Sequence, residues 1–337
     1  MFSLLDRPNS PARRAALALG ACLALTPLSA CSGADSDPLE TIPAFALDTP
    51  AVEVTEAGER PQLLEYTDAS AGEDATAWET TVEVSTGLDQ DVLPADHIDE
   101  HSQAPAGGNV DTVTLPLQVA SSPAAEPGEG ESPAAREVEF TVGTATHSDL
   151  DRNEELASAK DFLMRWRAAE SGAISTLKLL APGDSTEAGR ETVERSLLLL
   201  ASTNVVLPKE PVGVGGSWTV RNRITGASNM LRTSTYTVTA IDGDRVELDV
   251  DVQERPTQQS LSIDNEVAGE LNGSSLDVET TSTTSQGSIT LDLTRPLPVA
   301  GQVASTTRLV YSGAGGTSSG FKVVQDVTEA LTYGADA

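Results

Sequence analysis

Residues 236–252, YTVTAIDGDRVELDVDV, indicate the fold more clearly than any other part of the chain. In the second half of this stretch, Val246, Leu248 and Val250 alternate with acidic residues, which is the period of a β-strand with one buried and one wet face. Asp242-Gly243 stands between two such runs, and this dipeptide favours a tight primed turn because both central positions of the turn need positive φ. The stretch therefore predicts an antiparallel hairpin.

The same alternation recurs along the chain, in residues 112–119, 137–142 and 289–294. We expect about ten to twelve strands with short connections, which favours an antiparallel sheet with one wet face. A sheet of that many strands curls or closes. The predicted fold class is therefore α+β: a large curved antiparallel sheet, half-barrel-like, with two helices packed on its concave face. Two smaller sheets divided near residue 205 are the alternative.

Two segments carry the period of a helix. The first has four apolar residues at 3-4-3 spacing: Leu156, Ala159, Leu163 and Trp166. The second runs from about residue 184 to residue 202 and begins with Asp184 and Glu187, which resemble a capping box. Ile174–Leu180, between the two segments, is expected to be a strand.

The N-terminus has the features of a secretory signal. Arg13-Arg14 precedes an apolar run of about eleven residues, which is too short to span a bilayer. Leu28-Ser29-Ala30-Cys31 then resembles the lipobox of bacterial lipoproteins, in which the cysteine thiol receives a diacylglyceryl group. This resemblance implies lipidation of Cys31 and a location on the extracytoplasmic face of the cell membrane. An ordinary secretory signal with a chance cysteine is the alternative.

These features divide the chain into a signal peptide (1–30), a lipidated tether (31–50) and a single curved-sheet domain (51–334). The tether is rich in proline and aspartate, and it lacks the periodicity needed to bury a core. Within the domain, segments 93–109 and 121–135 combine turn-forming residues with charge, and we expect both to be disordered surface loops.

Charge and cysteine content exclude several function classes. The chain has a formal net charge of −30, which repels nucleic acid and anionic lipid headgroups. Its two cysteines are Cys22, inside the signal peptide, and Cys31, so the mature chain has no free thiol. Thiol proteases and zinc ribbons are therefore excluded, and we expect no cofactor.

One short motif has the letters of a metallopeptidase site. His97-Ile98-Asp99-Glu100-His101 is an H-x-x-E-H pattern, in which two histidines on one helical face bind zinc and the glutamate activates water. The motif lies between Pro94 and Pro105 without the apolar residues that would bury such a helix, so we interpret it as a polar loop. No P-loop or dinucleotide-binding motif is present, and the letters G-x-S-x-G occur only at residues 316–320, in a glycine-rich run that we expect to be a hairpin loop. The sequence predicts a protein that is not an enzyme, with no catalytic or metal-ligating residue.

The most distinctive local stretch is residues 207–218, LPKEPVGVGGSW. It resembles a family of bacterial envelope lipoproteins of unknown function that carry Leu-Pro-x-x-Pro-Val-Gly-x-Gly-x-x-Trp between a helix and a strand. The resemblance covers about residues 150–335 and implies an envelope location but no activity. The bias toward alanine, glycine, threonine and arginine is typical of actinobacteria. At the level of architecture, the predicted half-barrel is similar to lipid-carrying lipoproteins.

The leading hypothesis for function is a membrane-anchored binding protein whose sheet holds a lipid or other amphiphilic ligand. Only twelve aromatic residues are available to fill a wide hollow. Four residues are candidates for the ligand wall, although core packing is the simpler role for them: Phe162, Leu163, Trp166 and Trp218. The alternative is a structural or protein-interaction module of the envelope, whose acidic surface meets a cationic partner. The sequence does not identify that protein partner.

Overall fold

The computed structural model describes residues 37–68, 78–102, 110–224, 230–262, 275–313 and 320–335. Pro38–Ala337 forms one compact unit, separate from Met1–Asp37. Fifteen strands of this unit form a single antiparallel sheet, and two more form a small second sheet. The predicted fold class is confirmed, with more strands than expected, and the alternative of two sheets divided near residue 205 is wrong.

The elements of the first half of the unit are β1 (Phe45–Ala46), β2 (Ala51–Glu56), β3 (Glu59–Gln62), β4 (Trp78–Pro94), η2 (Ala95–His97), β5 (Val110–Pro123), β6 (Arg136–Val142), β7 (Thr146–His147), η3 (Leu150–Arg152), α1 (Asn153–Ala157), β8 (Leu163–Ala168) and β9 (Ile174–Leu180). The second half contains α2 (Glu187–Ser202), β10 (Val212–Val214), β11 (Ser217–Ile224), β12 (Met230–Asp242), β13 (Arg245–Pro256), β14 (Ser260–Ser262), β15 (Ser275–Asp292), β16 (Ala300–Gly313) and β17 (Phe321–Tyr333).

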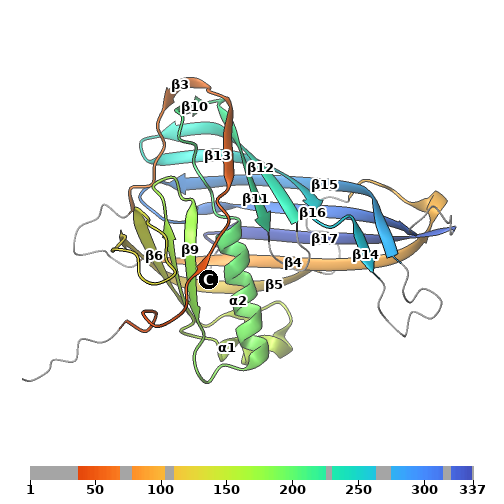
Figure 1. Cartoon of the computed structure of the whole chain (residues 1–337), viewed down its shortest axis with the longest axis horizontal. Coiled ribbons are helices and arrows are strands. Elements are labelled where there is room, and N and C mark those ends of the chain that lie inside the picture. Colours follow the sequence, from red (N-terminus) through yellow and green to blue (C-terminus); the bar gives the residue numbers. More distant parts are fainter. Residues whose placement is uncertain are drawn as a thin grey trace, which may run out of the picture. The chain divides into compact units, whose positions relative to one another are not determined.

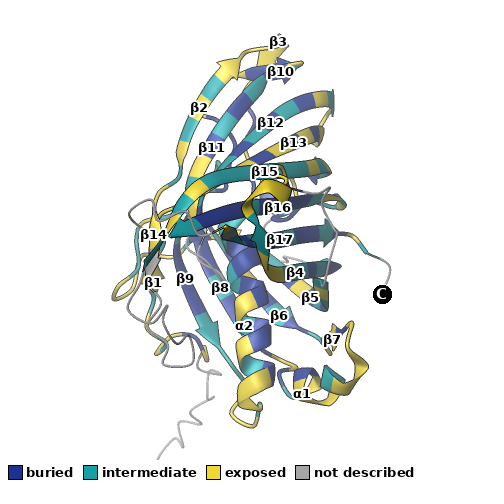
Figure 2. Cartoon of the chain, turned by 90° about the vertical axis from the view of Figure 1, so that its right-hand side faces the viewer, coloured by how far each residue is buried: buried dark blue, intermediate teal, exposed yellow. Residues whose placement is uncertain are grey.

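The sheet consists of two meanders joined side by side. Its strand order is β1-β9-β8-β6-β5-β4-β17-β16-β15-β13-β12-β11-β2, so the pairing of β4 with β17 joins the two halves of the chain. In this order β9 lies near one end and β11 near the other. The helix α2 connects them in sequence and therefore crosses the concave side of the sheet (Figure 1). Residues 47–50 connect the two outermost strands, so the edges of the sheet approach within about 20 Å there. Figure 2 shows the sheet curving around α2.

The helix α2 confirms the second predicted helix, with a different start. Thr186 caps it by accepting a hydrogen bond from the backbone N–H of Gly189, at 3.1 Å, whereas the capping pair predicted at Asp184 and Glu187 does not form the cap. The helix has one strongly buried face, which includes Val193, Leu197 and Leu200. It therefore stands inside the curve of the sheet as a filling element.

The first predicted helix is wrong over most of its length. Only α1 is helical, and the chain then turns into the strand β8. Because side chains alternate along a strand, Trp166 is fully buried on the concave side while Leu163 lies half-buried on the other face. The 3-4-3 spacing was coincidental, since Arg165 and Arg167 alternate with Trp166 in the period of a strand.

The predicted hairpin at residues 236–252 is confirmed, with its turn one residue further along. Asp242 pairs with Arg245, so Gly243 and Asp244 are the central residues of the turn. Gly243 has φ +60°, and Asp244 is not in the positive-φ region. This pattern matches a type II′ turn, in which only the first central position needs a glycine.

Two predicted boundaries change. Residues 38–50 are not a free tether, because Leu39 is buried and β1 pairs with β9. Segment 121–135 is not disordered: its first three residues belong to β5, and Glu131 forms ion pairs from the following loop with Lys178 at 2.7 Å and Arg167 at 3.4 Å. Burial alone would raise the pKa of Glu131, but hydrogen bonds from Lys178 and the Gly128 backbone lower it. The signal peptide and Cys31 lie outside the described residues.

Candidate functional site

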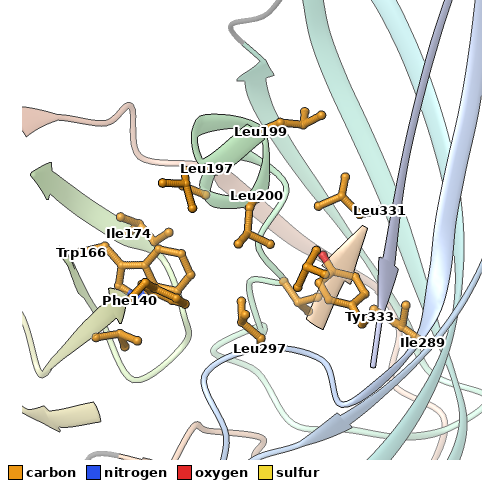
Figure 3. Close-up of a cluster of buried hydrophobic side chains, with 14 of the residues drawn as sticks. Phe140, Trp166, Ile174, Leu197, Leu199, Leu200, Ile289, Leu297, Leu331 and Tyr333 are labelled. Atoms are coloured by element: carbon orange, nitrogen blue, oxygen red, sulfur yellow. The ribbon is translucent and has the colours of Figure 1, made fainter. Parts of the chain in front are cut away.

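The hollow of the sheet is filled by side chains. Leu197 and Leu200 of α2 stand between Phe140 and Trp166 on one side and Tyr333 on the other (Figure 3). The Phe140 and Trp166 rings are 4.4 Å apart, and both are almost fully buried. A cavity of only about 20 Å³ remains on the concave side beside Tyr333. A small-molecule site needs a few hundred cubic ångströms, so this conformation has no room there for a lipid.

The four residues considered for a ligand wall are not gathered around a cavity. Phe162, Trp166 and Trp218 are at most 1% exposed and belong to the main apolar core. Trp218 stacks on Tyr236 with ring centroids 5.2 Å apart. Leu163 lies on the opposite face of β8 from Trp166. These side chains therefore act as core in the described structure.

The motif at residues 207–218 has a structural role in this fold. The indole N–H of Trp218 donates to the carbonyl of Val206 at 2.9 Å, so the residue just before the motif fixes the orientation of the Trp218 ring. Gly213 is needed because a Cβ there would lie 1.9 Å from the carbonyl oxygen of Glu59, and Gly215 has φ +78°. The chain thus turns tightly from α2 into β11, beside the small sheet of β3 and β10.

The histidine motif does not form a metal centre among the described residues. Ala95–His97 is a single 3-10 turn, so His97 and His101 do not share a helix face. His147 lies on β7, where it pairs with Val113. No group of three or more His, Cys, Asp or Glu in the described ranges is arranged to hold a metal ion.

Buried charge was missed by the sequence reasoning. Arg136 pairs with Asp68 at 2.6 Å with both side chains 1% exposed, and its guanidinium lies 4.4 Å from the ring centre of Tyr66. Burial lowers the pKa of Arg136, against the opposing charge of Asp68. The sequence does contain a signal for this burial, because Arg136, Val138 and Phe140 occupy alternate positions of one strand and so point to the same buried face. These contacts join the chain before β4 to the sheet.

A second buried network lies on the concave side of the sheet. Arg232 donates to Glu254 at 2.7 Å and to Glu329 at 2.5 Å, which joins β12, β13 and β17. Burial raises the pKa of Glu329 despite the opposing charge of Arg232. Beyond this network, a separate apolar cluster contains Met230, Leu309, Tyr311 and Val327. The network therefore separates the main core from the far end of the long strands.

The far end of β4 pairs with a described strand on one side only. β5 begins at Val110, opposite Gly87, so residues 88–94 pair with β17 on one side and with no described strand on the other. We call this segment the distal edge of β4, and Figure 1 shows β4 running with β15, β16 and β17 away from α2. Its inner face carries Leu88 and Val92, which are 52% and 64% exposed. These two side chains extend the apolar cluster outward, since they stand opposite Val327 and Val323.

The outer face of the distal edge is acidic. Asp89 and Asp91 are both exposed, and neither has an ion-pair partner among the residues that the structure describes. Asp89 stands opposite Asp326, whose carboxylate is already held by Arg308 at 2.8 and 2.7 Å. Within the described ranges, the edge therefore combines backbone groups that no neighbouring strand pairs with, exposed apolar side chains on one face and uncompensated carboxylates on the other.

Comparison with known proteins gives one match. A family model described as a family of unknown function (DUF6263) matches residues 198–297. This region runs from the end of α2 through β15 and contains the whole stretch at residues 207–218. No curated protein matches the chain. The match is therefore consistent with an uncharacterised family and brings no activity or ligand. No helix in the described ranges is long and apolar enough to cross a lipid bilayer.

Proposed function

We propose that this chain is a non-enzymatic, extracytoplasmic lipoprotein, anchored through a lipid on Cys31, that binds a partner protein along the distal edge of β4. The observation that carries the proposal is that residues 88–94 pair with no described strand on the side away from β17, next to exposed Leu88 and Val92. Edge strands of this kind are templates for adding another strand, and natural proteins usually protect them. An added strand gains affinity from main-chain hydrogen bonds and specificity from alternate side chains.

The chemistry of the edge selects the partner segment. A strand added beside β4 places alternate side chains against Leu88 and Val92 on one face and against Asp89 and Asp91 on the other. The complementary segment is therefore extended, with apolar and basic residues in alternation. A second copy of the same edge is a poor partner because it would bring the aspartates of both copies together, and like charges directly opposite are destabilising.

A lipid or other apolar ligand inside the sheet is the competing use of this architecture. It requires space that Leu197 and Leu200 occupy, because both side chains are fully buried against the sheet. Binding there would need α2 to leave the hollow and expose its buried face. The filled core thus favours the interaction module over the carrier.

The test uses a fluorescent seven-residue peptide in which lysine and valine alternate, with a peptide of the same composition in block order as its control. Fluorescence anisotropy measures binding to the wild-type chain and to Asp89→Lys with Asp91→Lys. The matched control is Glu247→Lys with Asp249→Lys, which makes the same charge change at exposed positions of β13 that pair with β12 on one side and with β15 on the other.

We expect the alternating peptide to bind the wild type better than the block peptide, and added salt to weaken binding, because exposed charges are screened. The change at Asp89 and Asp91 should abolish binding while the control change leaves most of it. Equal binding of the two peptides, or equal loss in the two variants, would show that general acidity and not the edge attracts the peptide.

A further inference from the structure

A second candidate site lies away from both the hollow and the distal edge of β4. It is a cavity of about 620 Å³ at the start of β4, the middle of β5 and the end of β6, beside the turn that precedes β8. This volume falls within the range of small-molecule sites, about 300–1,000 Å³. The cavity is therefore large enough for a ligand, and none of the four residues singled out from the sequence lines it.

The sheet brings three polar side chains of this cavity onto one face. Glu79 stands opposite Gln118, and Gln118 stands opposite Thr141 across the next strand pair. Gln118 donates to the Glu79 carboxylate at 3.5 Å, which is a weak bond. Neighbouring positions in register on adjacent strands point the same way, so these groups form one polar floor.

The turn before β8 contributes two charged side chains to the wall. Lys160 and Asp161 are exposed, and neither side chain has a bonded partner among the described residues. Asp161 has φ +69°, one of two non-glycine residues with positive φ in the described ranges. Its backbone N–H donates to the carbonyl of Val142 at 2.8 Å, which fixes the turn against β6. The strained residue is held where it faces the cavity.

Most of the remaining lining is apolar, apart from Thr80 and Thr81. Trp78 and Pro116 contribute to the wall, and the guanidinium of Arg295 lies 5.5 Å from the centre of the Trp78 ring. Pro116 shares the face of Gln118, whereas Trp78 stands opposite Val119 on the other face of β4 and borders the cavity from there. Apolar groups thus border the cavity together with carboxylate, amide, hydroxyl and ammonium groups. Such a mixture provides hydrogen-bond donors and acceptors at close range together with a surface for C–H groups.

We propose that this cavity binds a neutral saccharide. Sugar hydroxyls both donate and accept, which suits Glu79 and Asp161 as acceptors and Lys160 as a donor. The C–H groups of a sugar ring suit contact with Pro116 beside the polar floor and with Trp78 where it borders the cavity. The polar floor would remain unpaired against a lipid chain, which is costly. An anion would meet two carboxylates on a chain whose net charge is −30.

Tryptophan fluorescence gives a direct readout of this site. The chain has three tryptophans, and Trp166 and Trp218 are 0% exposed, so acrylamide should quench mainly Trp78. The probes are the tetrasaccharides of N-acetylglucosamine, mannose and glucose, added singly to the full-length chain. Isothermal titration calorimetry measures affinity in parallel.

The variant Gln118→Ala removes the central amide of the floor, and Asp161→Asn removes a carboxylate while keeping a residue that tolerates positive φ. The matched control is Gln253→Ala, since Gln253 is an exposed strand residue that donates to Asp251 at 3.4 Å. None of these positions lies on the distal edge of β4, so the outcome is independent of the proposed partner site.

We expect at least one tetrasaccharide to bind with a Kd at or below about 1 mM and to protect Trp78 from acrylamide. Gln118→Ala and Asp161→Asn should weaken that binding about tenfold, and Gln253→Ala should leave it unchanged. Absence of binding by all three sugars overturns the proposal. Binding without protection of Trp78, or binding that Gln118→Ala does not weaken, overturns it as well.

Discussion

Leu200 is the side chain whose removal tests the filled hollow most sharply. It is 0% exposed and stands on the face of α2 that contacts the sheet (Figure 3). Leu200→Ala removes three carbon atoms from a site enclosed by rigid strands, so the cavity should collapse only in part. Leucine-to-alanine changes in such sites cost about 3–5 kcal/mol. For a chain of this size, that corresponds to a fall in Tm of about 6–10 °C.

The assay is denaturant unfolding followed by tryptophan fluorescence, since Trp166 and Trp218 report on the same core. Leu198→Ala is the matched control, because Leu198 lies on the same helix and is only half-buried. It should cost about 1 kcal/mol, in proportion to the smaller area buried. If both substitutions cost the same small amount, α2 does not fill the sheet and the account of the core is wrong.

Three further outcomes are expected. Gly189→Ala should destabilise the fold by about 1–3 kcal/mol in denaturant melts, because a Cβ there would lie 2.1 Å from the Glu155 carbonyl oxygen. This loss should outweigh the helix preference of alanine. Gly183→Ala is the control and should not destabilise the fold, because a Cβ at that position meets no atom within 4 Å. Burial raises the pKa of the Glu329 carboxyl above its value in an unfolded chain, which is about 4. Ionisation of this carboxyl therefore lowers the free energy of unfolding as the pH rises above about 4. Glu329→Gln should therefore gain stability relative to wild type over that rise, and a constant difference between pH 4 and pH 8 would contradict this. Cys31→Ser should move the protein from the membrane to the soluble fraction of fractionated cells, and unchanged membrane association would refute lipid anchoring at Cys31.

Much of the sheet was predictable because period-two alternation is a local property. Residues 236–252 predict their hairpin without reference to the rest of the chain, and the structure differs only in the position of the turn. The first helix failed because apolar residues at helical spacing also occur by chance. In β8, Arg165 and Arg167 turn outward while Trp166 turns inward, a pattern that competes with the helical one.

The candidate sites were not predictable, since both arise from long-range pairing. Among the residues that the structure describes, the distal edge of β4 has no neighbour because β5 begins opposite Gly87, and no local pattern near residue 87 reveals where its partner begins. The larger cavity joins Gln118 to Asp161 and to Val299, which are far apart in sequence. The packing of the hollow was equally hidden, because the leucines of α2 look the same whether they line a pocket or fill it.

The central claim is that the curved sheet has a filled core and binds its partner from outside. Mass spectrometry of the full-length chain purified from its own envelope tests this most directly, by comparing the native mass with the mass after denaturation in organic solvent. The proposed covalent lipid on Cys31 would appear in both spectra, so only a non-covalent ligand would make them differ. The account predicts no loss of lipid mass on denaturation. A discrete lipid released from the native protein would contradict it, and would mean that α2 leaves the hollow to admit a ligand.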